Sequence, residues 1–151
     1  FLTPEEYFAF LGSICDLSEE ELTGRLKEYE PLMNGEILGQ KKLIRNLSAG
    51  NKQKVGIIAA MLNNPQLLIL DEPFNFLDPS SQNTLKRTLC DYHHRIGASV
   101  LLSSHNLQHT VDISNRIVLL EKGRVVSDIE NVNGSAARQL DEYFYISESE
   151  G

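Results

Sequence analysis

Residues 1–46 place apolar side chains at the spacing of amphipathic helices. Thr3 opens the run Thr-Pro-Glu-Glu, in which threonine can cap a helix, proline fits its first turn and the second glutamate completes a capping box. Ser18, with a glutamate three positions later, opens a second helix that we expect to reach about Tyr29. A third, short helix is expected over Ile37–Ile44. The stretch 1–46 is therefore predicted to be a helical subdomain without strands.

The following stretch has the pattern of helices that alternate with strands. Ser48 precedes a helix whose apolar positions recur every three or four residues. The apolar run Leu67–Leu70 has the length of a strand, and such continuous runs are typical of parallel strands buried on both faces. A second buried strand is expected over Ser99–Ser103, after a helix over 79–95. Strand, helix and strand in this order predict a right-handed crossover and a parallel sheet.

The end of the chain predicts a hairpin between two helices. A helix is expected over 106–113 and a final helix over 136–144, and the strands 117–120 and 124–127 pair around a Glu-Lys-Gly turn. The fold class is therefore α/β, with a parallel sheet preceded by an α-helical subdomain. The predicted parts are the helical subdomain over 1–46, an α/β core over 47–130, and a C-terminal helix and tail over 131–151.

Net charge limits the class of partner, and the cysteines and apolar runs limit the class of protein. The formal net charge is −7, which argues against nucleic acid as a partner because phosphate-backbone binding needs a basic face. The two cysteines, Cys15 and Cys90, are far apart in the sequence, so we expect reduced thiols in a cytosolic protein. The apolar runs fall well short of the about 20 residues that a membrane-spanning helix needs.

Two acidic residues follow the first predicted strand directly. Asp71 and Glu72 stand at its carboxyl end, which is the edge where open α/β sheets bind ligands. An aspartate there can hold Mg²⁺ on nucleotide phosphates, and the adjacent glutamate can deprotonate a water. The alternative is a strand that simply ends in acidic residues, but the position at the strand end favours the functional interpretation.

Three further features are candidates for the same chemistry. The run Leu47–Asn51 has small residues at a helix start, where backbone N–H groups can approach a phosphate. His105 follows the second strand, and its imidazole could bond to a terminal phosphate. Asp78, before Pro79, caps a helix whatever else it does. Taken singly, the first two are better explained as an ordinary serine-capped helix and as a surface or packed histidine.

The order and spacing of these features resemble the ABC ATPase family. LSAGN at Leu47–Asn51 is similar to the family signature, commonly LSGGQ, and LLILDEP at Leu67–Pro73 to its Walker B segment. Asn75–Asp78 resembles the D-loop of the family, and His105 its switch histidine. The resemblance covers nearly the whole chain.

The signature departs from the common form at two positions. Ala49 stands where glycine is usual and Asn51 where glutamine is usual, whereas Gly50 is retained, so a close backbone approach is still expected. The stretch Asn51–Val55 looks like bacterial exporters with separate membrane subunits.

The sequence also contains no phosphate-binding loop of the form G-x-x-x-x-G-K-[ST]. In the family this loop precedes the helical subdomain, so we expect it to lie upstream of Phe1, which is not a methionine. The loop supplies backbone N–H groups and a lysine that hold the phosphates. We therefore expect this chain alone to bind ATP poorly and to be inactive. A sheet without the strand that carries this loop should expose an apolar edge, so we also expect the chain to self-associate.

The resemblance implies a head-to-tail dimer with a second ATP-binding subunit, and ATP and Mg²⁺ as cofactors. Ser48–Asn51 would contact the γ-phosphate held by the partner, and Asp71 would position Mg²⁺. Glu72 would be the general base, His105 would hold the γ-phosphate and the attacking water, and Asp78 would couple the two sites.

The implied function is ATP hydrolysis that moves a substrate across a membrane. Transmembrane permease subunits would be partners, and the protein would lie on the cytoplasmic face of the plasma membrane. Two alternatives stay open: an ABC ATPase that acts on ribosomes or DNA, and a non-catalytic interaction domain. The compact acidic helical stretch and the lack of a heptad run favour transport.

Overall fold

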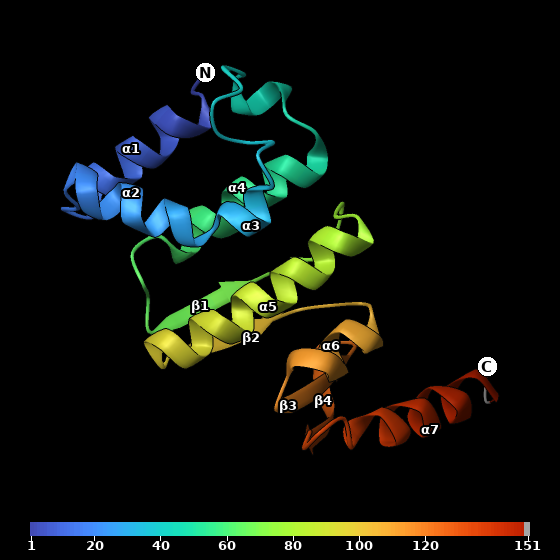
Figure 1. The fold of residues 1–151 in the computed structure, drawn as a ribbon. Coiled ribbons are helices and arrows are strands. Elements are labelled where there is room, and N and C mark those ends of the chain that lie inside the picture. Colours follow the sequence, from blue (N-terminus) through green and yellow to red (C-terminus); the bar gives the residue numbers. More distant parts are fainter. Residues whose placement is uncertain (150–151) are drawn as a thin grey trace. The chain divides into compact units, whose positions relative to one another are not determined.

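The computed structural model describes residues 1–149, and side chains as far as Glu142 (Figure 1). The end of the predicted tail, residues 150–151, lies outside the described residues. The contacts group the chain into two compact units, Phe1–Ser103 and the residues from Ser104 onward. The boundaries predicted at residues 46 and 130 stay predictions.

Two capped helices open the first unit, as predicted. In α1 (Pro4–Ile14), the backbone N–H of Thr3 donates to Glu6 Oε2 at 2.8 Å, and the N–H of Glu6 donates back to Thr3 Oγ1 at 3.3 Å. In α2 (Glu19–Glu28), Ser18 and Glu21 exchange the same two bonds at 2.8 and 3.2 Å. Both capping boxes therefore satisfy backbone donors that a helix start leaves open.

The helix predicted over residues 37–44 is wrong. After α3 (Glu30–Met33), the chain forms turns, and only the 3₁₀ helix η1 (Ile44–Asn46) follows. Gly35 and Gly39 have φ values of 66° and 76°. Such left-handed residues interrupt a right-handed helix. Single apolar side chains of this segment are buried instead, among them the fully buried Ile37.

The parallel pairing predicted for the two strands is confirmed. β1 (Leu67–Leu70) pairs with β2 (Ser99–Leu102), with Leu70 opposite Leu102. Figure 1 shows the connecting helix α5 (Pro79–Ile96) lying along both strands. Gly97 ends this helix in the left-handed region, at φ 69°, where glycine carries no Cβ penalty.

The prediction that these strands are buried on both faces is wrong. Leu68 and Leu70 are buried, whereas Leu67, Ile69 and Leu101 are 57%, 63% and 61% exposed. Successive side chains of a strand point to opposite faces of its sheet. The helices of the first unit therefore cover one face of this two-stranded sheet and leave the other face apolar and open.

The second unit is a hairpin packed with helices. Its elements are α6 (Leu107–Ile113), β3 (Arg116–Glu121), β4 (Arg124–Glu130) and α7 (Ala136–Ser149). The predicted hairpin is confirmed, and α7 is longer than predicted. Ile117 and Leu140 are buried in the core of this unit with Ala136. Among all described residues, no helix combines the length and the apolar character needed to span a bilayer.

Candidate functional site

The predicted acidic pair lies at the carboxyl end of β1. Asp71 is exposed and Glu72 is partly buried. The hydroxyl of Ser103 donates to Asp71 Oδ1 at 2.5 Å and accepts the backbone N–H of Glu72 at 2.9 Å. Ser103 was not among the residues singled out from the sequence. Its position could have indicated this contact, because Ser103 follows β2 directly and stands opposite Asp71 when the parallel pairing is continued by one residue.

The backbone of Glu72 is held in an uncommon conformation. Its φ is 46°, in the left-handed region that non-glycine residues seldom occupy. Its carbonyl oxygen accepts the backbone N–H of Asn75 at 3.1 Å and the side-chain amide of Gln53 at 3.3 Å. Residues in such conformations often belong to functional sites, where the surrounding contacts compensate the strain.

The helix that begins within the LSAGN run starts directly against the segment after the acidic pair. A Cβ on Gly50 would lie 2.7 Å from the carbonyl oxygen of Phe76. The structure therefore uses this glycine for contact with the Asn75–Asp78 segment, in addition to the phosphate approach expected from the sequence. Together with the bond from Gln53 to Glu72, this contact places the LSAGN run beside the acidic segment.

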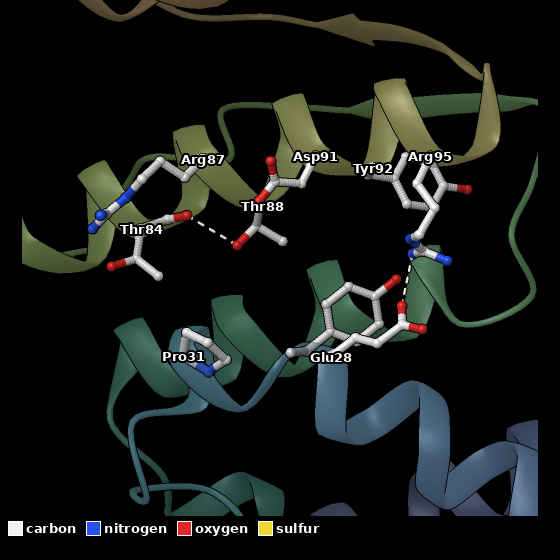
Figure 2. A pocket seen from close by; sticks show the side chains of 9 residues that line it. Glu28, Pro31, Thr84, Arg87, Thr88, Asp91, Tyr92 and Arg95 are labelled. Carbon is white, nitrogen blue, oxygen red and sulfur yellow. Dashed lines mark hydrogen bonds and ion pairs between the residues drawn. The ribbon is translucent and has the colours of Figure 1, made fainter.

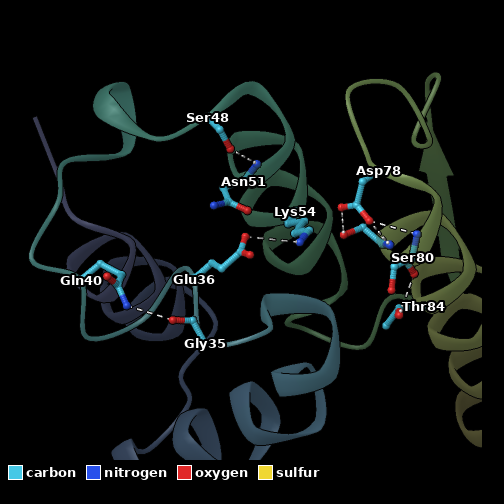
Figure 3. A network of polar contacts seen from close by, with 10 residues as sticks. Gly35, Glu36, Gln40, Ser48, Asn51, Lys54, Asp78, Ser80 and Thr84 are labelled. Atoms are coloured by element: carbon cyan, nitrogen blue, oxygen red, sulfur yellow. Dashed lines mark hydrogen bonds and ion pairs between the residues drawn. The ribbon is translucent and has the colours of Figure 1, made fainter.

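The N-terminus of this helix, α4 (Ala49–Met61), is capped and accessible (Figure 3). Ser48 Oγ accepts the backbone N–H of Asn51 at 3.1 Å, so the hydroxyl hydrogen can still donate to another group. Ser48 and Ala49 are exposed. The helix start can thus present backbone donors and a hydroxyl to an anion.

Asp78 caps α5, as predicted. Its Oδ1 accepts the backbone N–H groups of Ser80 and Ser81 at 3.0 and 3.1 Å, and its Oδ2 accepts the Ser81 hydroxyl at 2.6 Å (Figure 3). The Ser81 hydroxyl, followed by these backbone donors, lowers the pKa of the Asp78 carboxyl below its usual value. The carboxylate is therefore ionised at neutral pH.

Lys54 on α4 carries a buried positive charge that was not predicted from the sequence. Lys54 is only 3% exposed, and its Nζ lies 4.0 Å from Glu36 Oε2 (Figure 3). Its positive charge also contributes to the lowered pKa of Asp78. The helical spacing could have indicated this, because Lys54 shares the buried face of α4 with Ile58 and Met61.

His105 belongs to the second unit, where it is exposed and precedes Asn106, the N-cap of α6. Its assigned role stays a prediction. Of the histidines that the sequence treats as structural, His93 contacts the carbonyl oxygen of Ala98 through Nδ1 at 2.8 Å.

The described residues contain no group of three or more histidine, cysteine, aspartate or glutamate side chains suited to a metal ion. Mg²⁺ in nucleotide sites takes only one or two carboxylates and completes its shell with phosphate oxygens and water. Asp71 can supply such a carboxylate, because it is exposed and Ser103 bonds to its Oδ1.

A separate cavity of about 560 Å³ lies between the α2–α3 region and α5 (Figure 2). Tyr29 and Tyr92 line it, and Arg95 forms an ion pair with Glu28 at 2.8 Å beside it. None of the predicted site residues lines this cavity. It is therefore distinct from the site around Asp71.

Comparison with known proteins identifies similar sequences and folds. A family described as "AAA domain, putative AbiEii toxin, Type IV TA system" matches residues 32–112. The spermidine/putrescine import ATP-binding protein PotA of Thermotoga maritima is 34% identical over 83% of this chain and 34% of its own length. The chain thus spans about a third of this curated relative.

Two solved structures share the fold. One, titled "Structure of ATP binding subunit of ABC transporter", is 30% identical with a TM-score of 0.76, and covers 95% of this chain and 61% of its own. The dimeric structure of MJ0796, a bacterial ABC transporter cassette, is 24% identical with a TM-score of 0.71, covering 87% of this chain and 58% of its own. The α/β fold with a parallel sheet predicted from the sequence is thereby confirmed.

Proposed function

Because the chain belongs to the family of ABC transporter ATP-binding subunits and matches an AAA-domain family over residues 32–112, we propose that it forms part of a site that hydrolyses ATP to drive transport across a membrane. The observation that carries this proposal is the contact between the start of α4 and the acidic segment. Gly50 lies against Phe76, and Gln53 donates to Glu72. The two motifs that the chemistry needs are therefore neighbours in one unit.

In the proposed mechanism, Asp71 would hold Mg²⁺ through its exposed carboxylate, whose Oδ1 accepts the Ser103 hydroxyl. When bound, the metal ion would neutralise charge on the phosphate oxygens. Glu72 takes the proton of the attacking water as general base, while its backbone N–H and its carbonyl oxygen are both hydrogen-bonded. His105 bonds to the γ-phosphate and to that water.

The start of α4 serves the ATP of a second subunit in this proposal. The hydroxyl of Ser48 and the backbone donors of Ala49, Gly50 and Asn51 face the γ-phosphate, where the helix N-terminus favours negative charge. Asp78, ionised through its serine contacts, couples the two sites. A dimer is supported by MJ0796, which is dimeric by its title.

The sequence does not contain the phosphate-binding loop G-x-x-x-x-G-K-[ST]. We propose that the 151 residues alone bind ATP weakly and do not turn it over, because that loop provides most donors to the phosphates. ATP and Mg²⁺ would be cofactors of the full-length protein.

The membrane partners and the direction of transport are the finer parts of the proposal. Permease subunits would bind the helical stretch, and the protein would lie on the cytoplasmic face of the plasma membrane. The Asn51–Val55 stretch favours export, whereas PotA is an import protein by name. Transport into and out of membrane vesicles that contain the full-length protein and its permease would distinguish the two directions.

The test of the ATPase proposal uses Glu72→Gln in the full-length protein. We expect turnover to fall about 10²- to 10⁴-fold, the range for loss of a general base, while ATP binding is retained. Light scattering should then show a dimer only with Mg-ATP, because the trapped nucleotide joins the subunits. Glu20→Gln, at an exposed position of α2, is the matched control. Undiminished turnover in the Glu72 variant would remove this residue from the role of base.

A further inference from the structure

We propose that Ser103 is a positioning residue for ATP hydrolysis, which orients the Asp71 carboxylate and holds the backbone of Glu72 through a single hydroxyl. The proposal rests on the function proposed for these two acidic residues. The observation behind it is the pair of bonds at 2.5 Å to Asp71 Oδ1 and 2.9 Å from the Glu72 N–H. One side chain thus contacts both residues of the acidic pair.

The sheet register explains why Ser103 stands there. Leu70 lies opposite Leu102, and the backbone N–H of Ser103 donates to the carbonyl of Leu70 at 3.0 Å. The pairing therefore continues one step beyond both strands. Because side chains alternate between the faces of a sheet, Asp71 and Ser103 share the face that carries the exposed Ile69 and Leu101.

The hydroxyl uses both of its hydrogen-bonding functions in this arrangement. A serine hydroxyl has one hydrogen to donate and lone pairs to accept. The hydrogen is donated to an oxygen of the Asp71 carboxyl group, and a lone pair accepts the backbone N–H of Glu72. Alanine could form neither bond, whereas threonine could form both.

The bond to the Glu72 N–H helps to hold a residue whose backbone lies in the left-handed region. Glu72 has φ 46°, and its carbonyl is already held by Asn75 and Gln53. Ser103 adds the contact on the amide side. Since Asp71 is exposed, loss of the hydroxyl would also free its carboxylate to rotate. Small displacements of positioned groups reduce catalytic rates strongly.

The first test measures steady-state ATPase activity of the full-length protein. Ser103→Ala is expected to lower kcat about 10- to 100-fold, the cost of a lost hydrogen bond to a charged group, and to raise the Mg²⁺ concentration needed for half-maximal rate. ATP affinity without metal should stay unchanged. Ser103→Thr should retain most of the activity. Ser99→Ala, the same substitution at the other end of β2, is the control.

The second test needs no turnover. In the Glu72→Gln background with ATP bound, electron paramagnetic resonance of free Mn²⁺ gives the metal affinity. We expect Ser103→Ala to weaken Mn²⁺ binding about tenfold and Ser99→Ala to leave it unchanged. If the alanine variant fails to fold, Ser103→Cys, a weaker donor of similar volume, replaces it in both tests.

The outcomes separate this proposal from the proposed function. If Ser103→Ala matches Ser99→Ala in both tests, or if threonine loses as much as alanine, the positioning role is overturned. If Glu72→Gln itself retains turnover, the ATPase assignment of the acidic pair fails, and the role of Ser103 fails with it. A lower kcat in Ser103→Ala that Ser103→Thr restores supports both the positioning role of Ser103 and the proposed function.

Discussion

The carbonyl oxygen of Phe76 stands 2.7 Å from the point where a Cβ on Gly50 would lie. Phe76 has φ 64° and is 74% exposed, so the chain turns sharply where it meets the start of α4. The contact explains why a glycine is retained at this position although its neighbour, Ala49, departs from the common signature.

We therefore expect Gly50→Ala to destabilise the protein. The new methyl group would push against backbone, and such overpacking costs about 1–3 kcal/mol. Gly56→Ala is the matched control, because it lies in the same helix with nothing within 4 Å of its Cβ position. It should stabilise by about 0.5–1 kcal/mol, since alanine is the better helix former. Urea unfolding measures both values, and equal effects would contradict the assigned contact.

The cap at Asp78 predicts a pH dependence. The Ser81 hydroxyl and the backbone donors lower the folded-state pKa of this carboxyl from 3.8, so its stabilising effect is present above that value and is lost as the pH falls through the lowered pKa. Asp78→Ala should lower the Tm at pH 7, and the difference from the wild type should shrink below about pH 4. Asp78→Asn keeps a capping oxygen without titrating, so its Tm difference from Asp78→Ala should not depend on this ionisation.

We expect the buried Asn131 to contribute strongly to the stability of the second unit. Its side-chain amide donates to the carbonyls of Val111 and Ser114 at 2.8 and 2.6 Å, and its Oδ1 accepts the N–H of Ala136 at 3.1 Å. It thereby joins the end of α6 to the start of α7. Asn131→Ala leaves these backbone groups unsatisfied and should cost about 1–3 kcal/mol.

The control for this prediction is Asn115→Ala. Asn115 is exposed and contributes a backbone carbonyl, which the substitution retains. We expect a change within about 0.5 kcal/mol, as for other surface substitutions. Hydrogen exchange of α6 and α7 amides measures the local effect, and a similar loss of protection in both variants would count against the role of Asn131.

The open face of the sheet predicts self-association of the 151-residue chain. Leu67, Ile69 and Leu101 form an exposed apolar strip on two paired strands, and such strips favour contact with a second molecule. Sedimentation over a range of concentrations should show oligomers that Ile69→Lys disperses. Ile14→Lys, at an exposed apolar position of α1, should leave them intact. A monomer at every concentration would contradict the prediction.

Local signals in the sequence determined most of the secondary structure. The boxes opened by Thr3 and Ser18 and the caps Ser48 and Asp78 all act within three residues of themselves, so short-range hydrogen bonding fixes where these helices begin. The order of strand and helix likewise determined the parallel pairing of β1 with β2. The acidic pair at the strand end followed from the same local pattern.

Tertiary structure decided what those local signals leave open. Whether Ile69 is buried depends on which helices cover the sheet, and the left-handed glycines between α3 and η1 outweighed an apolar pattern over residues 37–44. Ser103 meets Asp71 across 32 residues of sequence, and Gln53 meets Glu72 across 19. Such contacts arise when strands pair and helices pack, and no short stretch of sequence encodes them. The sequence by itself therefore determined the motifs and their helices and strands, while folding decided which groups hold them in place.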